Sequence, residues 1–211
     1  MRDRVADRET TYVRRVAIIA TASGCGKTTF GRALAARLDV PFHELDSIHW
    51  RSGWRETEAS DLRRRVAPLV AGDAWVIDGS YRTKLGDLVL EAADTVVWLD
   101  LPRRVWLARL ARRTLRRLLF SEELWNGNRE SLRGALVGPG SLFGYALRTA
   151  PRRRQRWPRE LARFRVARLR SQAEVDAFVR HVWCQDGQPA SETDFCQGQT
   201  APNPYRSFHR P

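Results

Sequence analysis

The feature that most constrains the fold of this chain is a short apolar run followed by a glycine-containing turn and a helical pattern. The run covers residues 16–20 and suits a strand that is buried on both faces. The turn carries Gly24 and Gly26, and the apolar positions of 27–38 then recur at helical spacing. This order predicts a parallel βαβ unit, in which the helix packs back onto its strand.

The same alternation continues along the chain. We expect further strands at 40–45, 75–78, 95–100 and 164–169, and helices at 56–71, from 102 onward, at 152–163 and at 172–182. Together these elements predict a three-layer α/β domain over 15–183 with a five-stranded parallel sheet. Within it, 114–150 is rich in glycine and is expected to form a basic, lid-like insert. We expect 1–14 to be a flexible extension and 184–211, which lacks periodicity, to be a disordered tail.

The turn after the first strand has the residues of a phosphate-binding loop. It fits the P-loop pattern G-x-x-x-x-G-K-[ST], except that Thr21 stands where the first glycine belongs. Such a loop curls backbone N–H groups around a phosphate, while its lysine reaches the β- and γ-phosphates and its hydroxyl holds Mg²⁺. We therefore expect ATP and Mg²⁺ here, with Cys25 a small loop residue rather than a nucleophile. The expected ATP-binding residues are Ser23, Gly24, Cys25, Gly26, Lys27, Thr28 and Thr29.

Two aspartates that end apolar strands compete for the role of magnesium carboxylate beside Thr28. Asp78 is followed by a glycine that permits close approach and, shortly after, by an arginine suited to phosphate. Asp100 is the alternative, although it can also cap the helix that Pro102 starts. The sequence therefore favours Thr28 and Asp78 as the metal-holding pair.

These stretches resemble the adenylate kinase-like group of P-loop kinases. The run 76–83, Val-Ile-Asp-Gly-Ser-Tyr-Arg-Thr, is similar to the stretch in which an Asp-Gly pair precedes a phosphate-binding arginine. The run 109–113, Arg-Leu-Ala-Arg-Arg, is similar to the paired-arginine helix that enters the lid. A closer resemblance, over 15–183, is to the bacterial topology modulation proteins, through the P-loop, 44–50, 53–54, 75–81 and 168–171. It implies strand order 2-3-1-4-5, ATP binding and phosphoryl transfer to an acceptor that is poorly defined in that family.

The resemblance also implies roles for single residues. Lys27, Arg109 and Arg113 would be catalytic, with the two arginines closing over the transferring phosphate. Arg82 would bind a phosphate of the acceptor, which is a nucleoside monophosphate or another small metabolite. Asp46 would orient or deprotonate an acceptor hydroxyl, with a plain surface aspartate as the alternative. Trp54 would line the acceptor pocket or belong to the core.

The basic excess of the chain is local. There are 37 basic and 24 acidic side chains, a net charge of +13, yet residues 1–100 hold 15 of each. Residues 101–170 hold 19 basic and 4 acidic side chains, which indicates an anionic partner at a defined place. The triplet 152–154 is expected to bind phosphate or to stay solvated. A nucleic-acid-associated ATPase is therefore the alternative function, although no nucleic-acid-binding module is readable.

The cysteines and the apolar runs bear on the compartment. Cys25, Cys184 and Cys196 show neither a CxxC motif nor zinc-ligand spacing, so we expect a reducing cytoplasm. The apolar runs are shorter than the roughly 20 residues that a membrane span needs. The sequence thus predicts a cytoplasmic protein with no membrane partner.

Overall fold

The computed structural model describes residues 13–129, 134 and 141–182. Most of the expected extension, the whole expected tail, Cys184 and Cys196 lie outside these residues. The main sheet has five strands in the order β2-β5-β1-β6-β7, and every neighbouring pair is parallel. Counted along the chain, this is the predicted order 2-3-1-4-5, which is confirmed. The strands are β1 (Arg15–Ala20), β2 (Phe42–Glu44), β5 (Trp75–Asp78), β6 (Thr95–Leu99) and β7 (Val166–Leu169).

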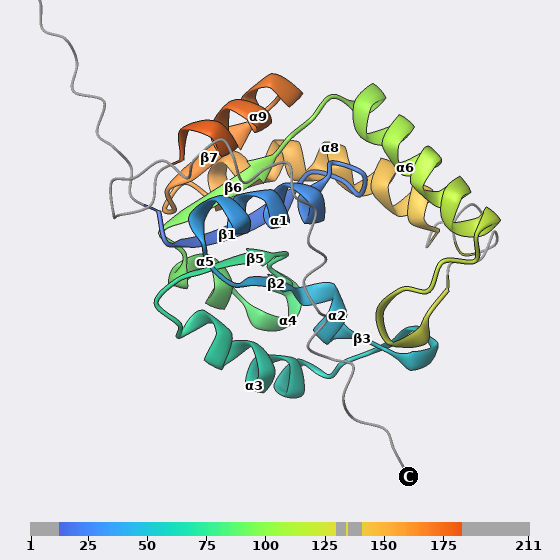
Figure 1. Ribbon diagram of the computed structural model, residues 1–211, viewed down its shortest axis with the longest axis horizontal. Helices are drawn as coiled ribbons and strands as arrows, with labels where there is room; N and C mark the ends of the chain where they lie inside the picture. The colour runs from blue at the N-terminus through green and yellow to red at the C-terminus, as the bar shows by residue number, and fades with distance from the viewer. Residues whose placement is uncertain (1–12, 130–133, 135–140, 183–211) are drawn as a thin grey trace, which may run out of the picture.

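Helices lie on both faces of this sheet, so the domain has the expected three layers (Figure 1). The side chains of β1 alternate between two hydrophobic clusters: Val16 and Ile18 join one and Ala17 and Ile19 the other. The first cluster packs beneath α1, α9, α6 and the start of α8, and the second beneath α3 and α5. The helices are α1 (Lys27–Leu38), α2 (Leu45–His49), α3 (Ala59–Val70), α4 (Arg82–Leu85), α5 (Leu88–Ala92), α6 (Arg103–Leu119), α8 (Leu142–Glu160) and α9 (Gln172–His181).

The segment between β2 and α3 differs from the expected pattern. Instead of a strand that ends at Asp46, the chain turns into α2 directly after Glu44, so Asp46 lies in the first turn of that helix. A small antiparallel hairpin follows, made of β3 (Trp50–Arg51) and β4 (Arg55–Glu56) around a 3₁₀ turn at Ser52–Trp54. This hairpin was not predicted, because two-residue strands leave no periodic signal.

Helix α8 begins ten residues before the predicted start at 152. Its N-cap is Ser141, whose hydroxyl accepts a hydrogen bond from the N–H of Gly144 at 3.2 Å. Ala146 and Ala150 bury this added part in the core, and Pro151 lies within the helix. Helix packing thus outweighs the glycine and proline signals that predicted irregular structure over the end of the 114–150 insert. Across the described stretches, none of the helices combines the length and the apolar composition needed to cross a bilayer.

Candidate functional site

The predicted phosphate-binding loop joins β1 to α1 and has the backbone such a loop needs. Gly24 and Gly26 adopt φ angles of 89° and 87°, in the region that side chains rarely enter. A Cβ at Gly24 would lie 2.3 Å from the carbonyl oxygen of Trp106, so α6 approaches the loop too closely for any other residue. Gly26 is the N-cap of α1, whose first N–H groups and dipole favour an anion at this end.

Thr21, at the position of the missing glycine, is part of a buried hydrogen-bond network. Its φ angle is not positive, so the backbone needs no glycine there. The hydroxyl donates to Oδ1 of Asp100 at 2.7 Å and accepts from the indole N–H of Trp98 at 2.8 Å. Thr21 is fully buried, and its departure from the P-loop pattern therefore leaves the loop's conformation intact.

Asp100 is the centre of this network rather than a metal carboxylate or a helix cap. Arg154 donates to its Oδ1 at 2.6 Å, and Arg168 donates twice to its Oδ2, at 2.6 and 3.0 Å. The guanidinium of Arg168 also lies 4.0 Å above the ring of Trp98. Burial alone would raise the pKa of Asp100, but the bonds from Arg154, Thr21 and Arg168 outweigh it and hold the pKa below its usual range.

The neighbouring Arg153 braces the loop directly. Its guanidinium donates to the backbone carbonyls of Ala20 and Thr21, at 3.4 and 3.2 Å. The prediction that 152–154 binds phosphate or stays solvated is therefore wrong for Arg153 and Arg154, which bind the protein itself. The sequence could not predict these bonds, because the partners of both arginines lie more than fifty residues away.

Lys27, Thr28 and Asp78 come together as predicted. The Nζ of Lys27 lies 2.9 Å from Oδ1 of Asp78, and the hydroxyl of Thr28 donates to Oδ2 of Asp78 at 2.7 Å. Glu44, which the sequence reasoning missed, accepts from the same hydroxyl at 3.2 Å. Glu44 and Asp78 are register partners at the ends of β2 and β5. The signal that would have found Glu44 is its place at the end of a strand beside the strand that carries Asp78.

This set of side chains suits a magnesium ion. A hydroxyl and carboxylates are the hard oxygen donors that Mg²⁺ prefers, and phosphates and water complete its shell in P-loop proteins. The described residues contain no cluster of three or more His, Cys, Asp or Glu suited to holding a metal alone. Burial would lower the pKa of Lys27, but Asp78, Asp46 and Glu44 outweigh it and raise the pKa. Thr28 and Asp78 could therefore hold Mg²⁺ only together with a nucleotide.

Asp46 lies next to this cluster and is held by Tyr81. The Tyr81 hydroxyl donates a hydrogen bond to Oδ1 of Asp46. Burial, together with Asp46, raises the pKa of Tyr81 far above its ordinary value, so the phenol stays protonated as a donor. The His49 ring packs 4.3 Å from the Tyr81 ring. Tyr81 was not predicted as a site residue, because its partner lies 35 positions earlier in the chain.

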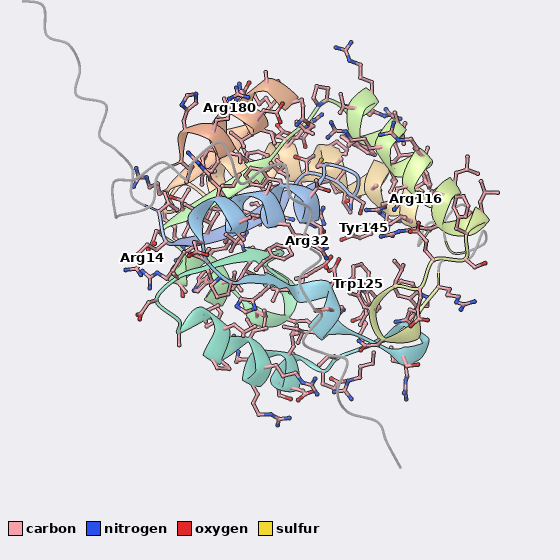
Figure 2. All side chains as sticks on the ribbon, viewed as in Figure 1. Arg14, Arg32, Arg116, Trp125, Tyr145 and Arg180 are labelled. Atoms are coloured by element: carbon pink, nitrogen blue, oxygen red, sulfur yellow. The ribbon has the colours of Figure 1, made fainter. Side chains whose placement is uncertain are left out.

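Trp54 belongs to an aromatic group beside these carboxylates. Its ring packs edge-on against Trp50 at 5.5 Å and Trp125 at 6.5 Å. Its backbone N–H donates to Asn128, and its indole N–H donates to the carbonyl of Arg129 at 3.1 Å. Segment 125–129 is therefore docked on the β3–β4 hairpin. Figure 2 shows Trp125 near α2, whereas Tyr145 of α8 lies nearer α6.

The three predicted arginines are placed differently. Arg109 extends over the loop, since its NH1 lies 3.7 Å from the Cβ position of Gly26, and it donates to Gln172 at 2.8 Å. Arg113 follows one turn later on α6 and is half-buried. Arg82 is held by acidic side chains outside the loop. Its guanidinium binds Asp87 and Glu160, and the hydrogen bond with Asp87 is the main cause that raises its pKa.

Comparisons with known proteins give distant relatives, and no family model matches the chain. An uncharacterized protein, YqaC of Bacillus subtilis, is 30% identical over 98 residues, which cover 46% of this chain and 54% of that protein. The shikimate kinase of Brucella canis is 26% identical over 123 residues, 52% of this chain and 62% of the kinase. Each match thus spans less than two thirds of the relative's length.

Among solved structures, a shikimate kinase from Acinetobacter baumannii in complex with shikimate overlays with a TM-score of 0.49 at 22% identity, covering 80% of this chain and 89% of that one. None of the relatives named here is a topology modulation protein, so that narrower resemblance stays a prediction. The strand order of the sheet and the backbone of the loop are those of a P-loop fold, and about half of the chain is similar in sequence to shikimate kinase.

Proposed function

We propose that this protein is an ATP-dependent phosphotransferase that acts on a hydroxyl group of a small metabolite. The observation that carries the proposal is the closeness of the P-loop to carboxylates at the ends of β2 and β5 and on α2. Lys27 and Thr28 bind Asp78, and Thr28 binds Glu44. Asp46, on the helix after β2, is close enough to Lys27 for its charge to help raise the pKa of that lysine. The similarity to shikimate kinase supports the same class of reaction.

The nucleotide side of this proposal rests on the loop and on α6. The N–H groups of 23–29 and the ammonium of Lys27 would hold the β- and γ-phosphates of ATP. Arg109, which already lies over Gly26, and Arg113 would neutralise the charge of the transferring group. Bound Mg²⁺ would supply further neutralisation from Thr28 and Asp78. Phosphoryl transfer needs such positioning and charge stabilisation more than covalent chemistry.

On the acceptor side, Asp46 would take the proton of the attacking hydroxyl. The acceptor oxygen forms a bond to the γ-phosphorus, the bond from that phosphorus to the ADP oxygen breaks, and the proton passes to the Asp46 carboxylate. Tyr81 holds this carboxylate in place through its donated hydrogen bond. Arg82 is occupied by Asp87 and Glu160, which favours a hydroxylated metabolite over a nucleoside monophosphate as the acceptor.

The alternative of a nucleic-acid-associated ATPase relied on the arginines of 101–170 being available to bind phosphates, and some of them are not. Arg154 and Arg168 pair with Asp100, and Arg153 bonds to carbonyls of the loop, so these three arginines serve the domain itself. The arginine-rich region is thus explained in part as the support of the P-loop.

Two measurements test the proposal. Acceptor-dependent ADP release, followed in a coupled assay over hydroxylated metabolites and nucleoside monophosphates, should exceed background for a member of the first class. ATP should raise the thermal midpoint of the wild type, and Lys27→Ala should abolish that shift. Lys84→Ala is the matched control, because the only other lysine binds Glu56 instead of the loop. Intact ATP binding without any acceptor-dependent ADP would refute the kinase.

A further inference from the structure

We propose that the outer face of α6 binds to the surface of a bilayer that contains anionic lipids. The inference is independent of the proposed reaction. It rests on an exposed apolar stripe along that helix, on the arginines beside the stripe, and on the position of α6 at the edge of the domain. Surface binding needs no membrane-spanning helix, and the sequence-based expectation of no membrane partner considered spanning runs only.

Helix α6 carries apolar side chains on two opposite faces. Its inner face is buried in the core through Trp106 and Leu110. The outer stripe has the spacing i, i+3, i+7 and i+11 that keeps side chains on one face of a helix, and it consists of Ala108, Ala111, Leu115 and Leu119. All four are exposed. Because the core already covers the inner face, packing within the domain does not account for the outer stripe.

The end of the stripe is its most exposed part. Leu115 is 59% exposed and Leu119 is 70% exposed, while Phe120, which follows at the helix end, is 74% exposed. These are the three most exposed large apolar side chains among the described residues. Single apolar residues are ordinary on a protein surface, but neighbouring ones at one helix end indicate a contact site.

The charge around the stripe is positive. Residues 103–123 hold seven arginines and two glutamates, a net charge of +5, and α6 itself contains no acidic residue. Arg104 and Arg112 lie one turn before and one turn after Ala108, on the face of the stripe. Both are exposed, and neither forms an ion pair within the stretches that the structure describes. The stripe therefore suits a partner that is negatively charged and can also take up apolar side chains.

A lipid surface has both properties, whereas other partners have one of them. Two copies of this chain that met through the stripe would bring the same arginines face to face. A nucleic acid would pair with the arginines but leave the leucines and Phe120 in water. A partner helix lies in a groove between elements, whereas α6 lies at the outer edge of the domain (Figure 1). Anionic headgroups pair with arginines while leucine and phenylalanine reach the acyl boundary.

Binding through the stripe would leave the P-loop accessible. The loop approaches α6 at Gly24, which lies against Trp106 and Leu110 on the inner face. The most exposed part of the stripe, 115–120, is on the outer face and at the other end of the helix. We therefore expect vesicles to change the proposed ATP affinity by less than twofold.

Vesicle sedimentation with the full chain tests the inference. The probes are vesicles of phosphatidylcholine alone and vesicles in which roughly half of the lipid is phosphatidylglycerol, at about 0.1 M salt. We expect the anionic vesicles to bind at least tenfold more tightly, and the affinity to fall as salt rises. Equal binding to the two kinds of vesicle, or binding to neither, would overturn the inference.

Apolar variants separate insertion into the bilayer from attraction by charge alone. Leu119→Ser combined with Phe120→Ser should weaken binding to anionic vesicles at least tenfold, with affinity for a DNA duplex within twofold. Leu119→Met combined with Phe120→Leu keeps apolar side chains and should retain vesicle binding. Circular dichroism verifies that each variant is folded. Undiminished vesicle binding by the serine variant would show that the protein binds polyanions only, and would overturn the inference.

Arginine variants test whether the binding belongs to α6. Arg104→Gln combined with Arg112→Gln should weaken binding to anionic vesicles about tenfold or more, at roughly 1 kcal/mol for each charge near the surface. The matched control, Arg159→Gln combined with Arg180→Gln, removes the same charge from exposed positions on α8 and α9. It should change the affinity by less than twofold. Equal losses in the two variants would assign the binding to net charge instead of α6.

Discussion

Thr21 shows at the scale of one residue why a motif can tolerate a departure from its pattern. Its side chain bonds to Asp100 and Trp98, while the left-handed positions that require glycine are Gly24 and Gly26. The loop therefore keeps its shape, and the threonine gains a role in stability. A glycine here would leave two buried polar groups without their partner.

The first prediction concerns that hydroxyl. Thr21→Val keeps the volume but removes the bonds to Asp100 and Trp98, and should lower the unfolding free energy by about 1–3 kcal/mol. Urea unfolding followed by tryptophan fluorescence measures this change. Thr21→Ser retains the hydroxyl and should lose less. Equal stability of Thr21→Val and the wild type would show that the network contributes nothing.

The second prediction concerns pH. Because the pKa of Asp100 is lowered in the folded protein, its ionised form stabilises the fold above the ordinary aspartate value. That contribution is lost as the pH falls through the folded pKa. Asp100→Asn should therefore be about 3–5 kcal/mol less stable than the wild type at pH 7. This difference in unfolding free energy between the two proteins should become smaller below about pH 4, where aspartate ordinarily titrates.

Unfolding curves for both proteins between pH 3 and 8 check this. Asp73→Asn, at an exposed position before β5, is the matched control and should follow the wild type throughout. A gap that stays constant over this range would contradict the assigned role of the Asp100 charge.

The site residues that could be predicted are those whose signal is local. Lys27, Thr28 and Asp78 were found because a motif and a strand end mark them. Tyr81 was missed, since its hydrogen-bond partner Asp46 lies 35 positions earlier and only the fold brings the two together. Arg82 was given an acceptor role because nothing in the sequence shows that Glu160, 78 positions away, holds its guanidinium.

At the scale of elements, α8 supports the P-loop from a distance in sequence. Its inward side carries Arg153 and Arg154, which bind the loop's first carbonyls and Asp100. The strands and α1 were predictable, because buried parallel strands give continuous apolar runs. The start of α8 was not, because its glycine and proline content conceals a helix that the core stabilises through Ala146 and Ala150.

The third prediction compares two arginines of α8. Arg154→Ala removes a partner of the buried Asp100 and should cost about 3–5 kcal/mol of unfolding free energy. Arg159→Ala, at an exposed position of the same helix, should change it by less than about 0.5 kcal/mol. Thermal and urea unfolding of the two variants give the comparison. Equal losses of unfolding free energy in the two variants would show that the bond from Arg154 to Asp100 does not stabilise the fold.

At the scale of the whole molecule, the net charge is +13, and the arginines that produce it are of two kinds. Some bind groups within the domain, and others lie exposed on the surface. Arg153, Arg154 and Arg168 anchor the loop, and Arg109 extends over it. Exposed arginines on α6 and α8, among them Arg104, remain on the surface. Such a surface attracts polyanions without selecting a sequence, through contacts that salt weakens.

The fourth prediction follows from this division. Double-stranded DNA should bind weakly, and its affinity should fall steeply as the salt concentration rises. At about 0.15 M salt, exposed charges more than about 8 Å apart are screened. DNA should therefore not stimulate ATP hydrolysis at that salt concentration. ATP turnover measured with and without DNA at two salt concentrations checks this. DNA-stimulated turnover that persists at the higher salt would favour the nucleic-acid-associated ATPase.

We propose that this P-loop protein transfers the γ-phosphate of ATP to a hydroxyl rather than to water. Phosphorus NMR of a reaction with ATP, Mg²⁺ and a hydroxylated acceptor tests it most directly. We expect the γ-phosphate resonance to disappear as a phosphate monoester resonance grows, and Lys27→Ala to abolish both changes. Release of inorganic phosphate alone, with no monoester, would contradict it.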